Sequence, residues 1–297
     1  MELAIWLLII GALLPIIYLG IGAYAAITLT KVGDHPQYDR VPSDFGVDYE
    51  AVHFPSRQDQ LQLAAWYLPN SDALNAMILV HGRNASKQNA ISGRMPELAS
   101  ALRKAGFAVL VLDLRGHGES EGKRYMWGVH ERRDVLGAMD FLRTKGYSAE
   151  KIGVLGISLG GAAALGAVFQ ERQVGALVLD STFASLEDLV DQNWKKEAGL
   201  PRFLLPGVFW MWRILFGFGI RDVRPVDEIR ELDTCPILIL HSKTDEAVPV
   251  SQALQMGEAA ANAAVILFDQ CDHAELFRDQ PSQYLGVLIS FLERVLQ

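Results

Sequence analysis

Residues 151–161 read KIGVLGISLGG, and this stretch decides the fold of the chain. An apolar run ends at Ile157, a Gly-x-Ser-x-Gly turn is centred on Ser158, and the small-residue segment AAALGAVFQ follows at 162–170. Glycines beside the serine permit a sharp strand-to-helix turn in which larger side chains would collide with neighbouring backbone. A helix that starts at Leu159 points its N-terminus at the serine and favours negative charge there. The stretch therefore predicts a strand, a nucleophilic serine and a helix, in that order.

Apolar runs bounded by turn residues continue on both sides of this turn and alternate with segments of helical periodicity. This alternation predicts an α/β fold with a mostly parallel central sheet and helices on both faces. The expected buried strands are residues 61–68, 76–80, 107–113, 151–157, 176–180, 236–242 and 264–269, and two expected helices are 96–106 and 130–146.

The regular spacing of strands breaks after the strand at 176–180. About fifty residues follow without a clear strand, a length that is uncommon for a loop without secondary structure of its own. We therefore expect a helical lid insertion at residues 181–233.

The N-terminal segment is apolar and carries no charged side chain from residue 3 to residue 30. About 20 such residues in a helix cross a hydrocarbon core of about 30 Å. We therefore expect a transmembrane anchor at residues 1–30. A polar, turn-rich linker at 31–50 and a catalytic domain at 51–297 complete the expected organisation.

A cleaved signal peptide is the alternative reading of this segment, since Ala-Tyr-Ala at 23–25 resembles a small-x-small cleavage site. The segment opens with Glu2, however, whereas signal peptides open with positive charge. Lys31 and Arg40 follow the apolar stretch, and basic residues flank membrane spans on the cytoplasmic side. The expectation is a single-pass membrane protein with a cytoplasmic catalytic domain.

Composition excludes several classes of function. The chain of 297 residues is 50% hydrophobic and 21% charged, with a net charge of -8. This charge, without any basic run, argues against a nucleic-acid partner. The sequence has no phosphate-binding Gly-rich loop, no dinucleotide fingerprint and no His-Glu-x-x-His pair. We therefore expect no cofactor and no metal.

Six segments together resemble the α/β-hydrolase superfamily, and within it the membrane-anchored serine hydrolases that carry an α/β-hydrolase domain. The resemblance covers residues 52–296. Its segments are LVHGRNAS at 79–86, DLRGHGES at 113–120, GISLGG at 156–161, DSTF at 180–183, HSKTDEAVP at 241–249 and DH at 272–273.

The resemblance implies a catalytic triad with the chain order Ser, acid, His. Ser158 is then the nucleophile and His273, in the loop after the last expected strand, is its general base. Asp245 is the favoured acid, because the acid must lie beside the histidine loop. Asp180 is the rival, since some members of the superfamily carry the acid after that earlier strand. Asp272 is expected to be a loop carboxylate.

The other histidines at 35, 53, 130 and 241 fit no such role, and His241 is expected to be a packed, hydrogen-bonded side chain. An oxyanion hole needs backbone N–H groups aimed at the developing charge. The resemblance assigns these to Leu159 and Arg83, with Asn84 as the alternative second donor. His81 is expected to brace this loop.

The expected function is that of a serine hydrolase, which cleaves a carboxylester, lipid ester or thioester of a small-molecule or lipid acyl substrate through an acyl-enzyme. A serine peptidase on the same fold is the alternative, and a catalytically silent, membrane-tethered binding protein is a second one. Within the insertion, Phe209 and Trp212 either bind an acyl chain close to the membrane surface or only cap the core.

Overall fold

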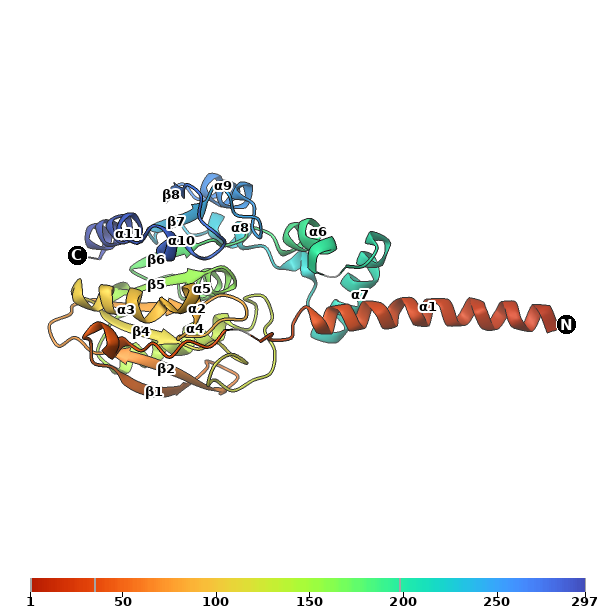
Figure 1. The fold of residues 1–297 in the computed structure, drawn as a ribbon, viewed down its shortest axis with the longest axis horizontal. Coiled ribbons are helices and arrows are strands. Elements are labelled where there is room, and N and C mark those ends of the chain that lie inside the picture. Colours follow the sequence, from red (N-terminus) through yellow and green to blue (C-terminus); the bar gives the residue numbers. More distant parts are fainter. Residues whose placement is uncertain (1, 35, 198, 297) are drawn as a thin grey trace. The chain divides into compact units, whose positions relative to one another are not determined.

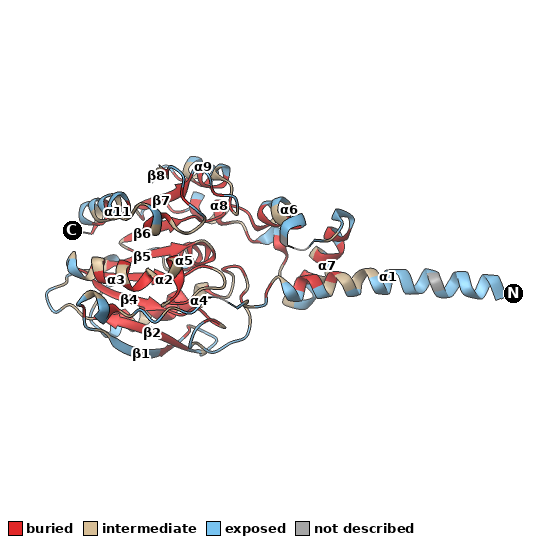
Figure 2. Ribbon diagram, viewed as in Figure 1, coloured by how far each residue is buried: buried red, intermediate tan, exposed pale blue. Residues whose placement is uncertain are grey.

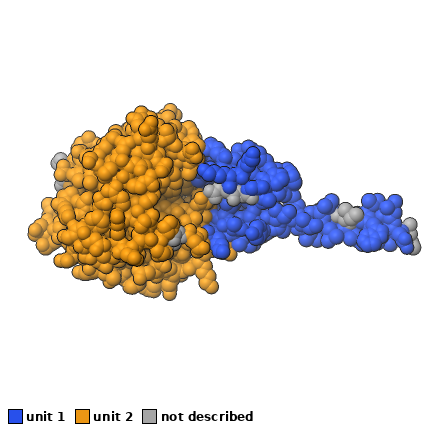
Figure 3. Space-filling model, viewed as in Figure 1, with its two compact units in different colours: residues 1–31, 185–224 blue, residues 32–184, 225–297 orange. Residues whose placement is uncertain are grey.

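The structure is a computed structural model that describes residues 2–34, 36–197 and 199–296. Two compact units make up the chain (Figure 3). Unit 1 consists of residues 1–31 and 185–224, whereas unit 2 consists of residues 32–184 and 225–297. Both units are therefore built from two separate stretches of the sequence.

The centre of unit 2 is an eight-stranded sheet with the order β1-β2-β4-β3-β5-β6-β7-β8 (Figure 1). The pairs β1·β2 and β2·β4 are antiparallel, and all other pairs are parallel. The strands are β1 Glu50–Pro55, β2 Gln62–Leu68, β3 Ala76–Val80, β4 Ala108–Leu112, β5 Ile152–Ile157, β6 Ala176–Asp180, β7 Ile237–Ser242 and β8 Ala263–Phe268.

Each apolar run that the sequence marks as a strand forms one strand of this sheet, but β1 is an addition to that prediction. The sequence of β1 contains no apolar run, because β1 is the edge strand of the sheet and only its Phe54 is buried. A strand that is exposed on most sides lacks the hydrophobic signal by which strands are recognised. The central strands, in contrast, are buried on both faces, as expected for parallel strands covered by helices.

Helices cover both faces of the sheet. One face shares a hydrophobic core with α3 and α11, in which Met77 and Leu79 of β3 and Leu155 and Ile157 of β5 take part. The other face carries α4, α5, α8 and α9, which contact one another in that order. The helices of unit 2 are α2 Ala90–Gly93, α3 Met95–Lys104, α4 Arg132–Thr144, α5 Leu159–Glu171, α8 Pro225–Arg230, α9 Val250–Ala259, α10 Leu276–Asp279 and α11 Pro281–Val295, with short 3-10 helices at Pro42–Phe45 and Ala149–Lys151.

The helix α5 is the most deeply buried of these helices, and its small residues explain why. Every residue from Leu159 to Val168 is buried (Figure 2). At Gly161, an added Cβ atom would collide with the side chain of Thr182. Small side chains thus let α5 lie close to the sheet, which fixes the turn in front of it.

The regular elements of unit 1 within its described residues are all helices. Its elements are α1 Glu2–Thr28, α6 Leu186–Glu197, the 3-10 helix Arg202–Leu204, α7 Leu205–Phe216 and the 3-10 helix Ile220–Asp222. The 27-residue α1 is the one described helix that is by itself long and apolar enough to cross a membrane, a property that a signal sequence shares. The insertion predicted at 181–233 therefore contributes residues 185–224 to this unit, while α8 belongs to unit 2.

Candidate active site

Ser158 lies on a strained turn between β5 and α5. Its backbone has φ 53° and ψ −116°, a conformation that a residue with a side chain adopts only when the surroundings impose it. The N–H of Ser158 donates a hydrogen bond of 2.8 Å to the carbonyl of Asp180 on the neighbouring strand. The turn also needs its glycines, because a Cβ atom on Gly160 would collide with the carbonyl of His81. These constraints hold the serine hydroxyl at the carboxyl end of the sheet.

His273 lies in the loop after β8 and contacts Ser158. Its Nε2 atom is 2.9 Å from the Ser158 Oγ, and its Nδ1 atom is 2.7 Å from Oδ2 of Asp245. A carboxylate accepts hydrogen bonds, so Nδ1 carries the proton and Nε2 is left to accept from the serine hydroxyl. About a quarter of the His273 side chain is exposed, whereas that of Asp245 is fully buried. The chain Ser158–His273–Asp245 therefore runs from the accessible end of the site into the protein.

Asp245 is held in its charged form by its neighbours. Burial alone would raise the pKa of this carboxyl group, but the hydrogen bond and charge of His273 and the N–H of Val248 outweigh burial and lower the pKa. Oδ1 accepts hydrogen bonds from the N–H groups of Ala247 and Val248 at 2.9 and 2.8 Å. Oδ2 is thereby left to the histidine, as an orienting acid requires.

Asp180, the rival acid, is occupied by other partners. Ser181 donates to its Oδ1 at 2.8 Å, and the hydroxyl of Tyr284 donates to its Oδ2 at 2.9 Å. Burial raises the pKa of Asp180 to about 6, even though both hydrogen bonds act in the opposite direction. The Ser181 hydroxyl also accepts the N–H of Ala274 at 3.2 Å, next to His273. Asp180 thus supports the histidine loop through Ser181, while the imidazole of His273 is hydrogen-bonded to Asp245.

Ser181 is a positioning residue that sequence reasoning missed. It has a positive φ of 53° and bridges the end of β6 to the loop that holds His273. The signal was present in DSTF at 180–183, where a hydroxyl residue directly follows a strand-end aspartate. The hydroxyl residue after the strand-end aspartate indicates a hydrogen bond to a neighbouring loop. The sequence does not show that this is the loop that holds His273.

The loop after β3 passes directly beside the serine. A Cβ atom on Gly82 would lie 3.3 Å from the Cβ atom of Ser158, which places the following residue, Arg83, next to the site. The N–H of Asn84 donates to Nε2 of His117 at 3.3 Å. That N–H group is therefore engaged away from the serine, and Arg83 is the better candidate for the second oxyanion donor. Leu159, the first residue of α5, has no acceptor for its N–H within the helix.

Two neutral histidines brace this loop. The N–H of Leu114 donates to Nε2 of His81 at 3.0 Å, so the protonated Nδ1 donates to the carbonyl of Gly82 at 2.7 Å. His117 has the same tautomer, since it accepts from Asn84 at Nε2 and its Nδ1 lies 3.0 Å from a backbone carbonyl. His81 therefore has the structural part expected of it.

The remaining charged groups near these loops are engaged in structural pairs. Lys87 is buried, and its ammonium group is 2.6 Å from the buried carboxylate of Asp113. Asp272 pairs with Arg278 at 2.7 Å and is exposed, as expected of a loop carboxylate. His241 is fully buried and donates from Nε2 to the carbonyl of Val248 at 2.8 Å. Burial lowers the pKa of His241, so this side chain is neutral.

No metal cluster is formed by His, Cys, Asp or Glu within residues 2–34, 36–197 and 199–296. His35 lies outside the described residues. His53 is located on the exposed edge strand β1, away from the strand ends that carry the site. His130 is half-buried, and burial lowers the pKa of its imidazole.

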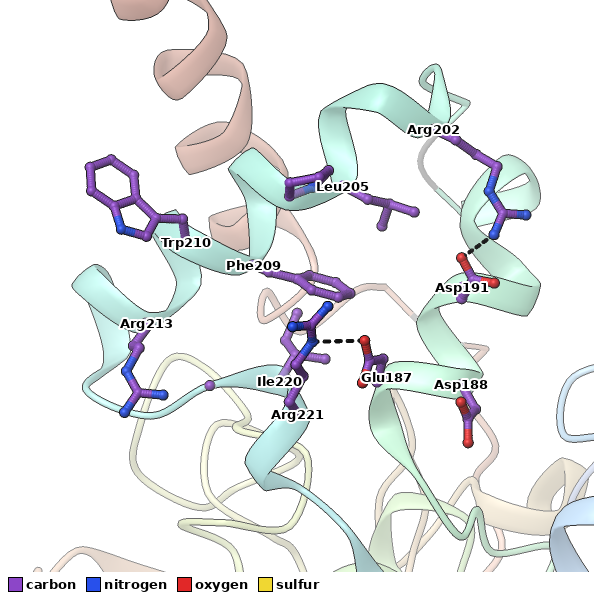
Figure 4. Close-up of a pocket in the computed structure, with 12 residues that line it drawn as sticks. Glu187, Asp188, Asp191, Arg202, Leu205, Phe209, Trp210, Arg213, Ile220 and Arg221 are labelled. Atoms are coloured by element: carbon purple, nitrogen blue, oxygen red, sulfur yellow. Dashed lines mark hydrogen bonds and ion pairs between the residues drawn. The ribbon is translucent and has the colours of Figure 1, made fainter.

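The predicted substrate-binding residues Phe209 and Trp212 both belong to α7 of unit 1. Phe209 lines a cavity of about 620 Å³ together with Leu205, Trp210 and Ile220 (Figure 4). Trp212 is fully buried and packs edge-on against Phe216 and Phe218. Of the two, Phe209 faces an open space and Trp212 belongs to the core of the unit.

Guanidinium groups and carboxylates also line this cavity. Arg221 donates to Glu187 at 2.8 Å, and Arg202 pairs with Asp191 (Figure 4). Arg213 also lines the cavity. All three arginine side chains are largely exposed, so their ion pairs add little to stability.

The order of the strands, their parallel pairing and the serine turn between β5 and α5 define the class of the protein as an α/β-hydrolase. A family model described as serine aminopeptidase, S33, matches residues 71–231, which is more than half of the chain. The chain belongs to this family, and the protein is a hydrolase.

Relatives of similar length occur in bacteria, fungi and plants. The uncharacterized protein YqkD of Bacillus subtilis is 25% identical over 259 residues, covering 86% of this chain and 78% of YqkD. The protein bem46 of Schizosaccharomyces pombe is 26% identical over 255 residues, covering 84% and 75%. The α/β-hydrolase domain-containing protein WAV2 of Arabidopsis thaliana is 29% identical over 276 residues, covering 86% and 82%.

Solved structures share the fold at lower identity. The Pyrococcus furiosus esterase Pf2001 superposes with a TM-score of 0.73 at 21% identity, covering 89% of this chain and all of the esterase. A 2-hydroxy-6-oxo-6-phenylhexa-2,4-dienoate hydrolase from a Rhodococcus strain has a TM-score of 0.61 at 18% identity, covering 83% and 99%. At these identities the likeness establishes the α/β-hydrolase fold.

Proposed function

We propose that the protein is a serine hydrolase that cleaves an acyl bond through Ser158, His273 and Asp245. The observation that carries this proposal is the unbroken chain of hydrogen bonds, with 2.9 Å between Ser158 Oγ and His273 Nε2 and 2.7 Å between His273 Nδ1 and Asp245 Oδ2. A serine hydroxyl is a weak nucleophile unless an adjacent base takes its proton. Here the base is in contact, and its other nitrogen is held by a buried carboxylate.

In the first half of the reaction, Ser158 Oγ attacks the substrate carbonyl while its proton moves to His273 Nε2. The carbonyl oxygen becomes an oxyanion, which the N–H groups of Leu159 and Arg83 stabilise. The tetrahedral intermediate then collapses, and the bond to the leaving group breaks. The leaving alcohol, thiol or amine takes the proton from His273, and the acyl group stays on the serine as an ester.

In the second half, water replaces the leaving group and the same steps run in the opposite direction. His273 takes a proton from the water, whose oxygen attacks the acyl carbonyl, and Ser158 is released with its proton restored. Asp245 stays ionised throughout and stabilises the imidazolium that forms twice per cycle. Since its pKa lies below the ordinary carboxyl value, Asp245 keeps this charge across the neutral range.

An activity-based probe tests this mechanism directly. A fluorophosphonate reacts with a serine that is deprotonated by a neighbouring base, so the intact protein should be labelled at Ser158. Ser158→Ala should abolish labelling and lower turnover roughly 10⁶-fold. Ser148→Ala is the matched control, because Ser148 precedes β5 at the opposite end of this strand. Labelling of Ser158→Ala at the wild-type rate would contradict the proposal and point to another nucleophile, whereas an intact protein that is not labelled would support a silent binding protein.

The proposed substrates are small-molecule or lipid acyl compounds: carboxylesters, lipid esters or thioesters. A serine peptidase activity is the second candidate, and the description of the matched family as serine aminopeptidase favours it. The triad chemistry is the same for both, because only the leaving atom differs. Rates measured side by side on acyl esters, acyl thioesters and aminoacyl amides distinguish the two, since the preferred leaving group will give the highest kcat/KM.

We further propose that Phe209 binds the apolar part of the substrate. Each methylene that leaves water contributes about 0.8 kcal/mol, so kcat/KM should rise several-fold per carbon over short acyl chains. Phe209→Ala should flatten this rise and leave hydrolysis of acetyl esters unchanged. Trp212→Ala is a poorer test, because removing a fully buried side chain destabilises unit 1 itself. A rate that is independent of acyl length would favour small polar esters or peptides instead.

We propose that α1 anchors the protein in a membrane, with the catalytic domain on the cytoplasmic side. The length and apolar character of α1 support the anchor, and Lys31 after the span supports the orientation. Full-length protein should stay with membranes through a carbonate wash. A mature protein that begins near residue 26 would instead identify α1 as a cleaved signal.

A further inference from the structure

The helices α1 and α7 of unit 1 are joined by an unusual hydrogen bond to a tyrosine. The first turn of a helix has N–H groups without acceptors inside the helix. In α7 the second residue is Pro206, which has no N–H, and the N–H of Gly207 donates to the hydroxyl of Tyr18 at 3.0 Å. The same hydroxyl donates to the carbonyl of Phe203 at 3.0 Å. Tyr18 of α1 therefore caps the start of α7.

The two helix backbones approach each other at a pair of glycines. A Cβ atom on Gly22 of α1 would lie 2.8 Å from the carbonyl carbon and oxygen of Gly207, which no real side chain tolerates. Gly11 and Gly20 on the same helix have open space around them. Burial of apolar surface gives no driving force for helix association within bilayers. Helices associate there through small residues at the crossing point and through interhelical hydrogen bonds.

The length of α1 determines where this contact lies relative to a membrane. Residues 2–17 are the part of α1 before its contact with α7, and they rise about 24 Å at about 1.5 Å per residue. A hydrocarbon core of about 30 Å requires about 20 residues. A spanning α1 must therefore place Tyr18 and the residues up to about Gly22 within the membrane as well, together with whatever is packed against them.

The outer surface of α7 suits this position. Its side chains Trp210, Ile214 and Leu215 are exposed by 55%, 56% and 43%, and Phe203 just before the helix by 69%. Arg202 and Arg213, on the turns that bound this surface, are exposed and can reach the headgroup region. Tryptophan and arginine beside apolar residues are typical of membrane interfaces. The 12 residues of α7 rise only about 18 Å, too little to cross a bilayer.

From these observations we propose that α7 is a second membrane-embedded element, which enters the bilayer beside the C-terminal half of α1 without crossing it. The partner of its exposed face is the lipid. This inference rests on the proposed insertion of α1, and it adds that residues 205–216 share the lipid environment of the anchor. The Tyr18 hydroxyl then satisfies backbone groups of α7 that water cannot reach.

Site-directed fluorescence tests the proposal on the full-length protein in phosphatidylcholine vesicles. An environment-sensitive fluorophore is attached to one introduced cysteine at a time, at Ile214→Cys, at Leu8→Cys on α1, or at Leu74→Cys on an exposed loop of unit 2. The natural thiols Cys235 and Cys271 are buried, and labelling of the parent protein measures their background. Lipids that carry a quencher in the acyl chain should quench positions 214 and 8, and leave position 74 unchanged.

The outcomes separate the two proposals. Quenching at position 8 together with full accessibility of position 214 to aqueous iodide would overturn the embedding of α7 and leave the anchor intact. If neither position is quenched, the anchor and the embedding of α7 both fail. Fluorophosphonate labelling of each variant verifies that unit 2 is folded.

A glycine substitution tests the helix contact itself. Gly22→Val should separate the helices and lower the lipid quenching at position 214, with position 8 unaffected. Gly20→Val is the matched control, since it adds the same side chain to the same helix in open space. Equal quenching at position 214 in both variants would show that α7 is not held in the membrane by α1, and would overturn the proposed pairing.

Discussion

Two neighbouring strands of the sheet lead to buried aspartates whose pKa values shift in opposite directions. Asp180 closes β6, and Asp245 follows β7, which pairs with β6 in parallel. Burial pushes both pKa values upward, yet the pKa of Asp180 rises to about 6 while that of Asp245 falls below its ordinary value. The difference lies in the donors. Asp180 is bound by the neutral hydroxyls of Ser181 and Tyr284, whereas Asp245 is bound by the imidazole of His273 and by backbone N–H groups.

Position at a strand end and burial therefore do not by themselves select the acid of such a site. A charge in a buried place persists when a group that can carry the opposite charge faces it. Asp245 faces one, and in the proposed mechanism that group becomes positive in every cycle. Asp180 faces hydroxyl groups, and its part is to hold the loop after β8 in place through Ser181.

The largest effect is expected from Asp245→Asn. An amide in place of the carboxylate can no longer hold the proton on Nδ1 of His273, so Nε2 is not free to accept from Ser158. We expect kcat on an activated ester to fall roughly 10⁴-fold, with slow residual fluorophosphonate labelling. Asp180→Asn is the matched control. If Asp180→Asn caused the greater loss of kcat, Asp180 and not Asp245 would be the acid that orients His273.

The next effect is on stability, in Asp180→Asn. The folded protein binds the proton of Asp180 more tightly than the unfolded chain, so ionising this group near neutral pH lowers the free energy of unfolding. A rise of the pKa from 3.8 to about 6 corresponds to at most about 3 kcal/mol. We expect Asp180→Asn to raise the melting temperature at pH 7 and to leave kcat close to that of the wild type. A lower melting temperature would mean that the carboxylate oxygens are needed by Ser181 and Tyr284.

The pH dependence of stability should have opposite signs for the two aspartates. For Asp180, with a raised pKa, stability is present at low pH and is lost as the pH rises from about 4 through about 6. For Asp245, with a lowered pKa, stability is present above the ordinary carboxyl range and is lost as the pH falls through the folded value. Melting curves of both Asn variants and the wild type from pH 3 to pH 8 measure these differences. Parallel curves for the two variants would refute the assignment.

The smallest effect is expected from Tyr284→Phe, which removes one donor to Asp180. A lost hydrogen bond to a buried group costs about 1 to 3 kcal/mol. Because the Tyr284 hydroxyl lowers the pKa of Asp180, its removal should raise that pKa further and extend the loss of stability to higher pH. Hydrolysis should be unaffected at pH 8. A strong loss of kcat in this variant would mean that Asp180 acts on the histidine after all.

Much of unit 2 could be predicted from the sequence, because its strands are buried on both faces and stand out as apolar runs. The turn at Ser158 was equally visible, since glycines on both sides of a serine have few other reasons to follow a strand and open a helix. The order of serine, acid and histidine along the chain came from the resemblance to a family. The structure adds the distances that bring these three side chains together.

What could not be predicted concerns contacts between segments far apart in the chain. The strand β1 is exposed and gives no hydrophobic signal. The sequence favoured Asp245 over Asp180, but it did not show that Tyr284, which lies 104 positions after Asp180, donates to the rival carboxylate. The sequence also did not reveal that α1 packs against α7 in the predicted insertion. Helix α1 carries tyrosines at positions 18 and 24, and the sequence does not show that the hydroxyl of Tyr18 is the one that meets α7.

If α1 is a membrane anchor, as proposed, the capping of α7 by Tyr18 determines how the protein can be released from the membrane. Many ectodomains and tethered enzymes are shed when a protease cuts a single stalk. Here a cut just after residue 31 would sever the chain of α1, but Gly207 would still be held by Tyr18 and α7 would stay beside its partner. Under the proposed anchoring, the hydrolase would have two attachments to the membrane, one covalent and one by helix pairing, and proteolysis at the stalk would not by itself release it.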